Sequence, residues 1–260
     1  MLKRLFPFFS YLKYFLLKED RHSLQAPFAF EVYEGLKSFS KQQPKDEELI
    51  KLKKRLLSND DEIRIEDFGA GSIHLKKNKL RKVSDITRHS SSSDKYSRLY
   101  QYLCSLTPAT TVIELGTCVG INTCYLSKAT NGKLYTFEGA SSLAQVAQTT
   151  FATFDNTRLI EGKIQKSLPS FLEDITLLDF VLIDAHHTYE ATLLFFELIK
   201  PKLHNDSIVA IGDIHWSPEM QKAWEQIKTH AEVTMSMDFY ECGILFFKKG
   251  INKKHYILNY

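Results

Sequence analysis

Residues 111–120, TVIELGTCVG, decide the fold class of this 260-residue chain. The first five are β-branched or apolar apart from Glu114, a pattern typical of a buried parallel strand. Gly116 and Gly120 then supply a glycine turn, and the stretch GTCVGINTCYLSKA, residues 116–129, has the pattern of a helix. A strand, a glycine turn and a helix in this order form the repeating unit of a doubly wound α/β sheet.

The same unit recurs toward the carboxyl terminus. Further strands are predicted at 133–140, 157–164, 178–185 and 207–214, with a closing pair at 233–240 and 243–249. Helical patterns fill the intervals between the first of these strands, which indicates parallel pairing. Only a short turn separates the closing pair, so we expect one of its strands to run antiparallel at the sheet edge. The prediction is a doubly wound, mostly parallel, seven-stranded Rossmann-like sheet with an antiparallel C-terminal hairpin strand.

The composition is that of an ordinary globular protein, with 43% hydrophobic and 25% charged residues. This balance argues against wholesale disorder. The formal net charge is only +3, which gives no general case for a nucleic-acid partner. The four cysteines include no Cys-x-x-Cys pair. That argues against a disulfide framework or a cysteine zinc site, and it is compatible with a cytoplasmic location.

We expect two parts: a helical N-terminal extension over residues 1–93, which caps the body and contains a basic loop, and the α/β domain over residues 94–260. The extension begins with the apolar, basic stretch MLKRLFPFFSYLKYFLLK, residues 1–18. One interpretation packs its apolar stripe onto the body of the protein. The stripe consists of Leu5, Phe8, Phe9, Leu12, Phe15 and Leu16. The other interpretation is an interfacial helix with weak, peripheral contact to the inner face of a membrane.

A second basic stretch, residues 76–82, follows two glycines. Such a charge run is commonly a solvated surface. The functional alternative is a mobile basic loop that closes over an anionic substrate.

Unusual polar residues follow four of the predicted strands. These residues are Glu114, Gly116 and Gly120 after the first strand, Glu138 after the second, Asp184, His186 and His187 after the fourth, and Asp213, His215 and Trp216 after the fifth. The carboxyl ends of parallel strands share one edge of a sheet, where ligands bind near the point of reversed strand order. We therefore expect a functional site at this edge.

The glycine turn indicates which ligand the site takes. A dinucleotide site uses Gly-x-Gly-x-x-Gly to hold a pyrophosphate, whereas Gly116 and Gly120 are spaced differently and Glu114 precedes them. Glu138 follows Gly120 by 18 positions (138 − 120), close to the spacing of about 20 at which an acid accepts hydrogen bonds from ribose hydroxyls. Ribose without pyrophosphate, beside carboxylates, suggests S-adenosylmethionine.

The motifs VIELGTCVG and YTFEGA, at 112–120 and 135–140, resemble the first two motifs of class I S-adenosylmethionine-dependent methyltransferases. The similarity continues through VLIDAHHTYE and IVAIGDIHWS and covers roughly residues 95–248. It implies that Gly116 and Gly120 let the backbone approach the methionine part of the cofactor, that Glu114 organises its amino end, and that Glu138 binds the ribose. The implied cofactor-binding set also contains Thr117, Gly139 and Asp184.

The third strand departs from the family pattern. Many members carry Gly-Asp-Ala there, the Asp meeting the adenine amine, whereas this chain has Gly162, Lys163 and Ile164. The adenine contact is therefore not assigned from the sequence.

The catechol-type, metal-dependent O-methyltransferases are also similar at strands four and five. They place Asp-x-x-Lys and Asp-Asn there, for a divalent cation and a base. Asp184 and Asp213 match the two acids, His187 falls at the lysine position, and Ile214 replaces the Asn. Asp184 and Asp213 are thus the candidate metal ligands, although the loss of the amide oxygen favours a metal-free reaction over a magnesium site.

Three histidines are candidate general bases, because an imidazole accepts protons near neutral pH. His187 is the first choice, His215 the second and His186 the third, with Asp213 as the assisting acid. Tyr189 and Trp216 are predicted to form a stacking wall for a sugar or aromatic acceptor.

The sequence therefore predicts O-methylation of a hydroxyl on a small molecule, a lipid-linked intermediate or a glycan. A metal-dependent catechol-type reaction is the alternative, and a non-catalytic adenosyl-ligand-binding or scaffold module is the alternative of a different class. A nucleic-acid substrate is disfavoured, because the motif that grips a flipped base is absent after strand four, where Asp184-Ala185-His186-His187 stands.

Overall fold

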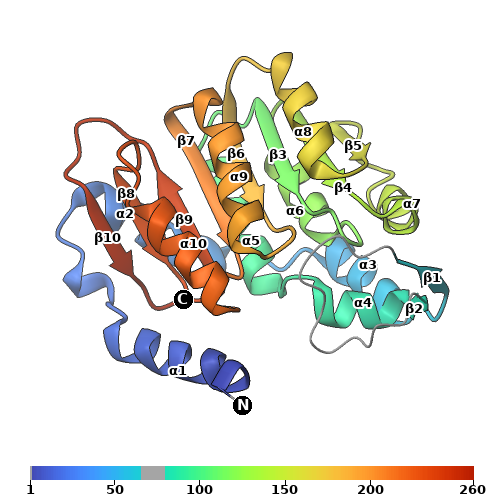
Figure 1. Cartoon of the computed structure of the whole chain (residues 1–260), viewed down its shortest axis with the longest axis horizontal. Helices are drawn as coiled ribbons and strands as arrows, with labels where there is room; N and C mark the ends of the chain where they lie inside the picture. Colours follow the sequence, from blue (N-terminus) through green and yellow to red (C-terminus); the bar gives the residue numbers. More distant parts are fainter. Residues whose placement is uncertain (1, 66–79) are drawn as a thin grey trace.

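A computed structural model describes residues 2–65 and 80–260, and helices and strands alternate as the sequence indicates (Figure 1). The N-terminal part contains α1 (Leu2–Leu17), η1 (Arg21–Ser23), α2 (Pro27–Gln42), α3 (Glu47–Leu57), β1 (Glu62–Arg64), β2 (Leu80–Lys82) and α4 (Val83–Ser90). The remainder contains α5 (Asp94–Ser105), β3 (Thr111–Leu115), α6 (Ile121–Ala129), β4 (Lys133–Glu138), α7 (Ser141–Thr150), β5 (Thr157–Glu161), α8 (Ile164–Glu173), β6 (Leu178–Ile183), α9 (Tyr189–Ile199), η2 (Lys200–Lys202), β7 (Leu203–Gly212), α10 (Pro218–Lys228), β8 (Met235–Asp238), β9 (Cys242–Phe246) and β10 (Lys254–Ile257).

The main sheet has the strand order β10-β8-β9-β7-β6-β3-β4-β5. All seven predicted strands are present, and β10 joins them as an eighth, parallel to β8. The antiparallel strand of the hairpin is β9, which lies between β7 and β8. The expectation that this strand forms the sheet edge is therefore wrong, because β8 and β10 continue the sheet beyond it. The doubly wound, mostly parallel fold class is confirmed.

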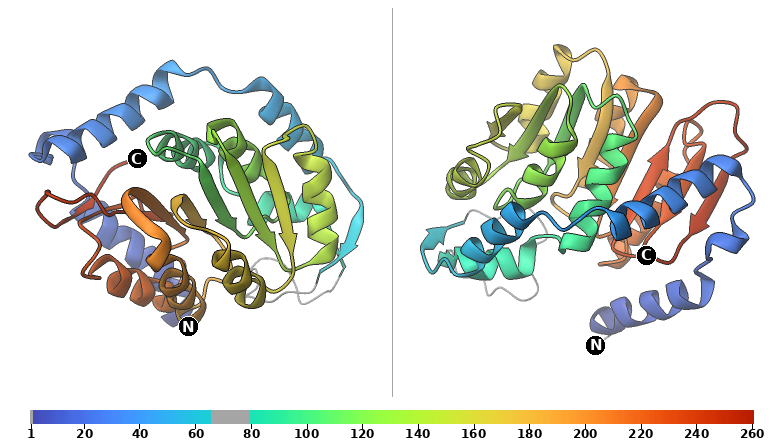
Figure 2. Two further views of the ribbon diagram at one scale, coloured as in Figure 1. Left: turned by 90° about the horizontal axis from the view of Figure 1, so that it is seen from above. Right: turned by 180° about the vertical axis from the view of Figure 1, so that it is seen from behind.

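Successive side chains of the central strands point to opposite faces of the sheet, and both faces are buried. Ile113, Val181 and Val209 belong to one apolar cluster, together with side chains of α8, α9 and α10. Val112 and Phe180 belong to the other, together with side chains of α2 and α5. The two helical layers lie on opposite faces of the sheet (Figures 1 and 2). This double burial explains why the strands are nearly continuous apolar runs.

Strand order reverses at β3. The chain first adds β4 and β5 on one side and then crosses to β6 and β7 on the other. Leu115 and Ile183 are register partners at the adjacent ends of β3 and β6. The segments that leave these two strands diverge to opposite faces, so a crevice at this point is the expected ligand site of the fold.

The N-terminal extension differs from its expected packing. The stripe from Leu5 to Leu16 is exposed on α1, so the prediction that it packs onto the body is wrong. The side of α1 that faces the body carries Ser10 and Tyr14 instead, because their hydroxyls have partners there. In the basic stretch 76–82, residues 76–79 lie outside the described residues, whereas Leu80–Lys82 form β2 and pair with β1.

No helix within residues 2–65 and 80–260 combines the length and apolarity needed to cross a membrane.

Candidate active site

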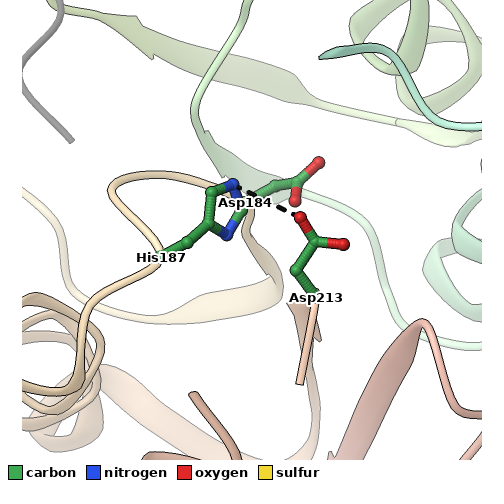
Figure 3. A group of neighbouring side chains, drawn as sticks. All are labelled: Asp184, His187 and Asp213. Carbon is green, nitrogen blue, oxygen red and sulfur yellow. Dashed lines mark ion pairs between the residues drawn. The ribbon is translucent and has the colours of Figure 1, made fainter. Parts of the chain in front are cut away.

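Asp184, His187 and Asp213 converge at the carboxyl ends of β6 and β7 (Figure 3). One ligating atom from each side chain lies within 4.8 Å of the other two. His187 Nε2 is 3.7 Å from Asp213 Oδ2. The structure thus brings together the first-choice base, the assisting acid and the acid that ends strand four.

The backbone around this group is held in an uncommon conformation. His186, His187 and Asp213 have φ values of 64°, 48° and 55°, in the left-handed region that side chains other than glycine rarely adopt. Hydrogen bonds hold this geometry, since the Asp213 amide donates to the Glu241 carbonyl at 2.6 Å and the His187 amide to the Ala185 carbonyl at 2.8 Å. Such local strain, costing on the order of 1–3 kcal/mol per residue, clusters at functional sites.

Asp184 lies deep in the group. Burial and the neighbouring Asp213 carboxylate raise the pKa of Asp184 to about 6, against the opposing effect of His187. Its Oδ1 lies against the backbone of Gly212, where a Cβ would stand 2.1 Å away. Its backbone carbonyl lies equally close to Gly116, whose φ is +105° and whose Cβ would stand 2.3 Å from that oxygen. The absence of a side chain at Gly116 therefore permits the close approach of the Asp184 backbone, which follows β6.

The three candidate histidines have three different environments. The His186 ring lies beside Gln165 and edge-on to Phe195, on the α8–α9 side. His187 alone joins the group with Asp184 and Asp213. The sequence cannot separate these neighbours, because two adjacent left-handed residues send their side chains in directions that no periodic pattern predicts.

His215 belongs to a separate buried group. Its Nε2 is 2.7 Å from Asp238 Oδ2 and its Nδ1 is 3.0 Å from Ser10 Oγ, while its ring stacks on Tyr240. With Nε2–H donating to the carboxylate, Nδ1 accepts from the Ser10 hydroxyl. Both ring nitrogens are thus engaged in joining α1 to the sheet.

The predicted stacking wall is divided. Trp216 lies beside His187, with ring centroids 6.1 Å apart. The Tyr189 hydroxyl donates to Gln226 Oε1 at 2.6 Å, and Lys222 lies over its ring. Tyr189 is therefore held against α10, and Trp216 is the aromatic residue that adjoins the histidine.

A second polar cluster, formed by Glu114, Thr117, Thr123 and Thr136, lies under the turn after β3. Glu114 is fully buried, and its Oε2 accepts hydrogen bonds from Thr123 at 2.5 Å and Thr136 at 2.6 Å. Burial raises the pKa of Glu114 to about 8. Its Oε1 has no hydrogen-bond partner among residues 2–65 and 80–260. A buried acceptor without a partner is costly, and a cationic ligand group would satisfy it.

Thr117 belongs to the same cluster through a contact with Thr136. It is almost fully buried, and its hydroxyl lies 2.6 Å from that of Thr136. Thr117 thus contacts the side chain that holds Glu114.

Glu138 joins two loops. Its Oε2 accepts from the Cys118 amide and its Oε1 from the Ala140 amide, both at 2.9 Å. Its carboxylate therefore lies between the turn after β3, which ends at Gly120, and the turn after β4, which contains Gly139. A carboxylate oxygen can accept more than one hydrogen bond, so a ligand hydroxyl could bind here beside the backbone amides.

The departure in the third strand has a structural counterpart. Ile164 is buried in the apolar core, and Lys163 caps the amino terminus of α8. Gly162 has a φ of +127° and open space where a Cβ would stand. Neither Lys163 nor Ile164 repeats the acid that many family members place there.

Two contributors to the site were not predicted. The Glu241 carbonyl fixes Asp213, and burial together with Asp213 raises the pKa of the Glu241 carboxyl. Tyr100 is buried, and this burial is the main cause that raises the pKa of its hydroxyl. The charges of Cys242, Asp184 and Asp213 raise the pKa further. Glu241 in a hairpin turn and Tyr100 in an amphipathic helix carry no sequence signal that distinguishes them from ordinary residues.

The group fits a divalent metal of the imidazole-binding kind. Two carboxylates and one imidazole match the preferences of Zn, Mn or Fe more closely than those of Mg. Ile214, at the position of the catechol-type Asn, is fully buried in the apolar core. The third oxygen ligand of the magnesium arrangement is therefore replaced by a core side chain.

Comparison with known proteins shows that part of the chain is similar to a methyltransferase domain. Residues 113–214 match a family model described as a methyltransferase domain. No curated protein sequence matches the chain. The match to the family model supports the resemblance to methyltransferases that the sequence indicates.

Several solved structures share the fold. The SAH-bound methyltransferase PaMTH1 from Podospora anserina has 11% identity and a TM-score of 0.60, covering 87% of this chain and 100% of that one. The O-methyltransferase from Bacillus cereus, in complex with SAH, has 13% identity and a TM-score of 0.57, covering 82% and 97%. TomG from Streptomyces achromogenes, an O-methyltransferase of tomaymycin synthesis in complex with SAM, has 15% identity and a TM-score of 0.53, covering 62% and 82%. At these identities they establish the fold.

Proposed function

We propose that this chain, whose residues 113–214 match a methyltransferase domain, is an S-adenosylmethionine-dependent O-methyltransferase. The observation that carries the proposal is a spatial one. The cofactor acids Glu114 and Glu138 lie on β3 and β4, and the group Asp184, His187 and Asp213 lies at the ends of β6 and β7, on the other side of the reversal point. A ligand bound at the reversal point would meet the two acids on one side and this group on the other, which suits a cofactor and an acceptor.

The cofactor half matches the chemistry of S-adenosylmethionine. Glu114 offers the ammonium of the methionine tail a buried oxygen that has no partner in the part of the chain that the structure describes. Glu138 offers lone pairs to the ribose hydroxyls, with its own orientation fixed by two backbone amides. Neither acid suits a pyrophosphate, which would be repelled. Three similar structures contain SAM or SAH.

The acceptor half matches a proton transfer. In the proposed step, an acceptor oxygen attacks the methyl carbon in line with the sulfonium sulfur. The new C–O bond forms as the C–S bond breaks, and the electron pair of the C–S bond passes to sulfur. His187 takes the hydroxyl proton, and Asp213, 3.7 Å from its Nε2, orients the ring and stabilises the resulting cation. Trp216 borders the acceptor.

We place the acceptor among hydroxyl compounds that are small molecules, lipid-linked intermediates or glycans, and the protein in the cytoplasm. All four cysteines are free thiols in the structure, which supports a reducing compartment.

The test is calorimetric titration with S-adenosylhomocysteine, followed by turnover with S-adenosylmethionine on a panel of hydroxyl acceptors. Binding with methylated product is the expected result. Tighter binding of NAD than of S-adenosylhomocysteine to this chain would contradict the proposal. Tight binding with no turnover on any acceptor favours the non-catalytic adenosyl-binding alternative.

A metal-dependent reaction is the second candidate, and the grouping of Asp184, His187 and Asp213 favours it. A divalent ion held there would polarise the acceptor hydroxyl and lower its pKa. Dialysis against EDTA distinguishes the two reactions: loss of activity with recovery on added Mn²⁺ or Zn²⁺ supports the metal, whereas unchanged activity supports His187 acting without one.

A further inference from the structure

The outward side of α1 is an apolar surface that no described part of the chain covers. Large side chains that are at least 43% exposed follow one another along the helix. They are Leu5, Phe8, Phe9, Leu12, Phe15, Leu16 and Leu17, with Phe8 at 63% and Leu16 at 73%. We call this set the α1 apolar face. A continuous exposed patch of this kind marks an interaction site, unlike single exposed apolar residues.

The opposite side of α1 is fastened to the sheet, so the outward orientation is fixed. Ser10 bonds to His215, and the Tyr14 hydroxyl donates to the Leu258 carbonyl at 2.6 Å. The Tyr240 hydroxyl donates to the Pro7 carbonyl at 2.9 Å. Because these contacts engage the polar side of the helix, burying the α1 apolar face against the body would break all three.

The charges of this segment indicate what covers the face. Residues 1–18 contain Lys3, Arg4, Lys13 and Lys18 and no acidic residue. Lys13 is exposed, and Lys18 Nζ lies 4.4 Å from the centroid of the Phe15 ring. Two copies of so basic a helix would repel each other, whereas an anionic surface would attract it. Aromatic side chains with basic flanks are typical of helices that lie in the interface of a bilayer.

We propose that α1 docks this protein onto an anionic lipid surface through the α1 apolar face. The helix has 16 residues, about 24 Å at 1.5 Å per residue, and it lies in the surface plane without crossing the bilayer, which takes about 20 residues. The docking requires only α1 and its anchors, and it holds or fails independently of the methyl-transfer chemistry.

The anchors place the docked surface beside the candidate active site. His215, Tyr240 and Leu258 follow β7, β8 and β10, and these strands run parallel. All three anchors therefore lie at the sheet edge that carries Asp213, and α1 runs along this edge (Figure 1). On the proposed function, this arrangement favours an amphipathic acceptor whose hydroxyl lies at the lipid–water interface.

Flotation of the full chain with vesicles tests the docking. Vesicles of phosphatidylcholine with phosphatidylglycerol should carry the protein, and vesicles of phosphatidylcholine alone should carry at least several-fold less. The double variant Phe8→Ser, Leu16→Ser should lower the partition coefficient at least tenfold. The matched control Phe30→Ser, Leu194→Ser removes two apolar side chains that are 43% and 42% exposed on α2 and α9, and it should change binding less than twofold.

All four positions are exposed, so we expect each variant to retain the fold. Thermal unfolding of each variant checks this expectation. The proposal is overturned if the wild-type chain does not float, or if the Phe8, Leu16 variant floats as well as the control. It is also overturned if the α1 variant abolishes self-association, measured by sedimentation, while vesicles bind neither protein. That result would assign the face to a second copy of the chain.

Discussion

The Asp184 carboxylate lies directly against the backbone of Gly212, so that a Cβ on residue 212 would stand 2.1 Å from Asp184 Oδ1. Asp184 directly follows β6, and Gly212 is the last residue of β7, the adjacent parallel strand. Residue 212 must therefore lack a side chain if Asp184 is to reach the group with His187 and Asp213.

We expect Gly212→Ala to displace Asp184 and to lower the methyl-transfer rate at least tenfold. A double-mutant cycle with Asp184→Ala checks the mechanism, because that variant removes the carboxylate that the new Cβ would meet. If the rate loss acts through Asp184, adding Gly212→Ala to Asp184→Ala should cost less than twofold. Additive losses in the double variant would show that residue 212 acts elsewhere.

His187→Ala should slow methyl transfer about a hundredfold, as expected for the loss of a general base. The affinity for S-adenosylhomocysteine should stay within twofold, because His187 lies on the acceptor side. His186→Ala is the matched comparison, since it removes the neighbouring imidazole from an equally left-handed residue beside Gln165. Single-turnover rates should show at least a tenfold greater loss for His187→Ala, and equal losses would count against His187 as the base.

Glu138→Ala should weaken S-adenosylhomocysteine binding about tenfold or more, because charge-assisted hydrogen bonds to the ribose and to two loop amides are lost. Glu161→Ala is its control. Glu161 is the register partner of Glu138 on β5 and is exposed, with the Ser141 hydroxyl as its hydrogen-bond donor. Calorimetry should find the control within twofold of the wild type, and unchanged affinity in Glu138→Ala would remove this acid from the cofactor site.

Glu114 should make ligand binding release protons. Its pKa of about 8 leaves most molecules protonated at pH 7, and an ammonium beside the carboxyl would favour the ionised form. Titration with S-adenosylhomocysteine in phosphate and in Tris, whose ionisation enthalpies differ, should reveal release of up to one proton. Glu114→Gln should abolish the release, and equal enthalpies in both buffers for the wild type would contradict the assigned role.

The same residue should shape stability in the absence of ligand. Because folding raises the pKa of Glu114 from 4.5 to about 8, the folded state binds more protons than the unfolded state between these values. The free energy of unfolding should therefore fall as pH rises from about 4.5 to about 8. The melting temperature of Glu114→Gln should fall less than that of the wild type over this range.

The positions of the two proposed cofactor acids in the sheet were predictable, because each acid lies in a strand that the sequence pattern indicates. Glu114 and Glu138 each belong to an apolar strand whose direction and burial follow from the residue pattern, so their place at the sheet edge follows as well. The hydrogen bonds that Glu138 makes to residues 118 and 140 were not predictable, since they depend on how two separate turns meet.

The amino terminus shows where pattern reasoning fails. The spacing of apolar residues on α1 is that of a buried stripe, yet the helix is fastened by Ser10 and Tyr14. Periodicity records which residues share a side of a helix and carries no information about which side meets the body. Partners more than 200 positions away, at His215 and Leu258, decided the orientation.

The sequence by itself determined the mostly parallel sheet and the edge at which the polar residues gather, because the strand, turn and helix patterns act locally. Only the tertiary structure decided that His187 joins two aspartates while His186 turns toward Gln165 and His215 binds Asp238. Those assignments depend on left-handed backbone angles and on contacts between distant segments. Such interactions exist only once the chain has closed on itself.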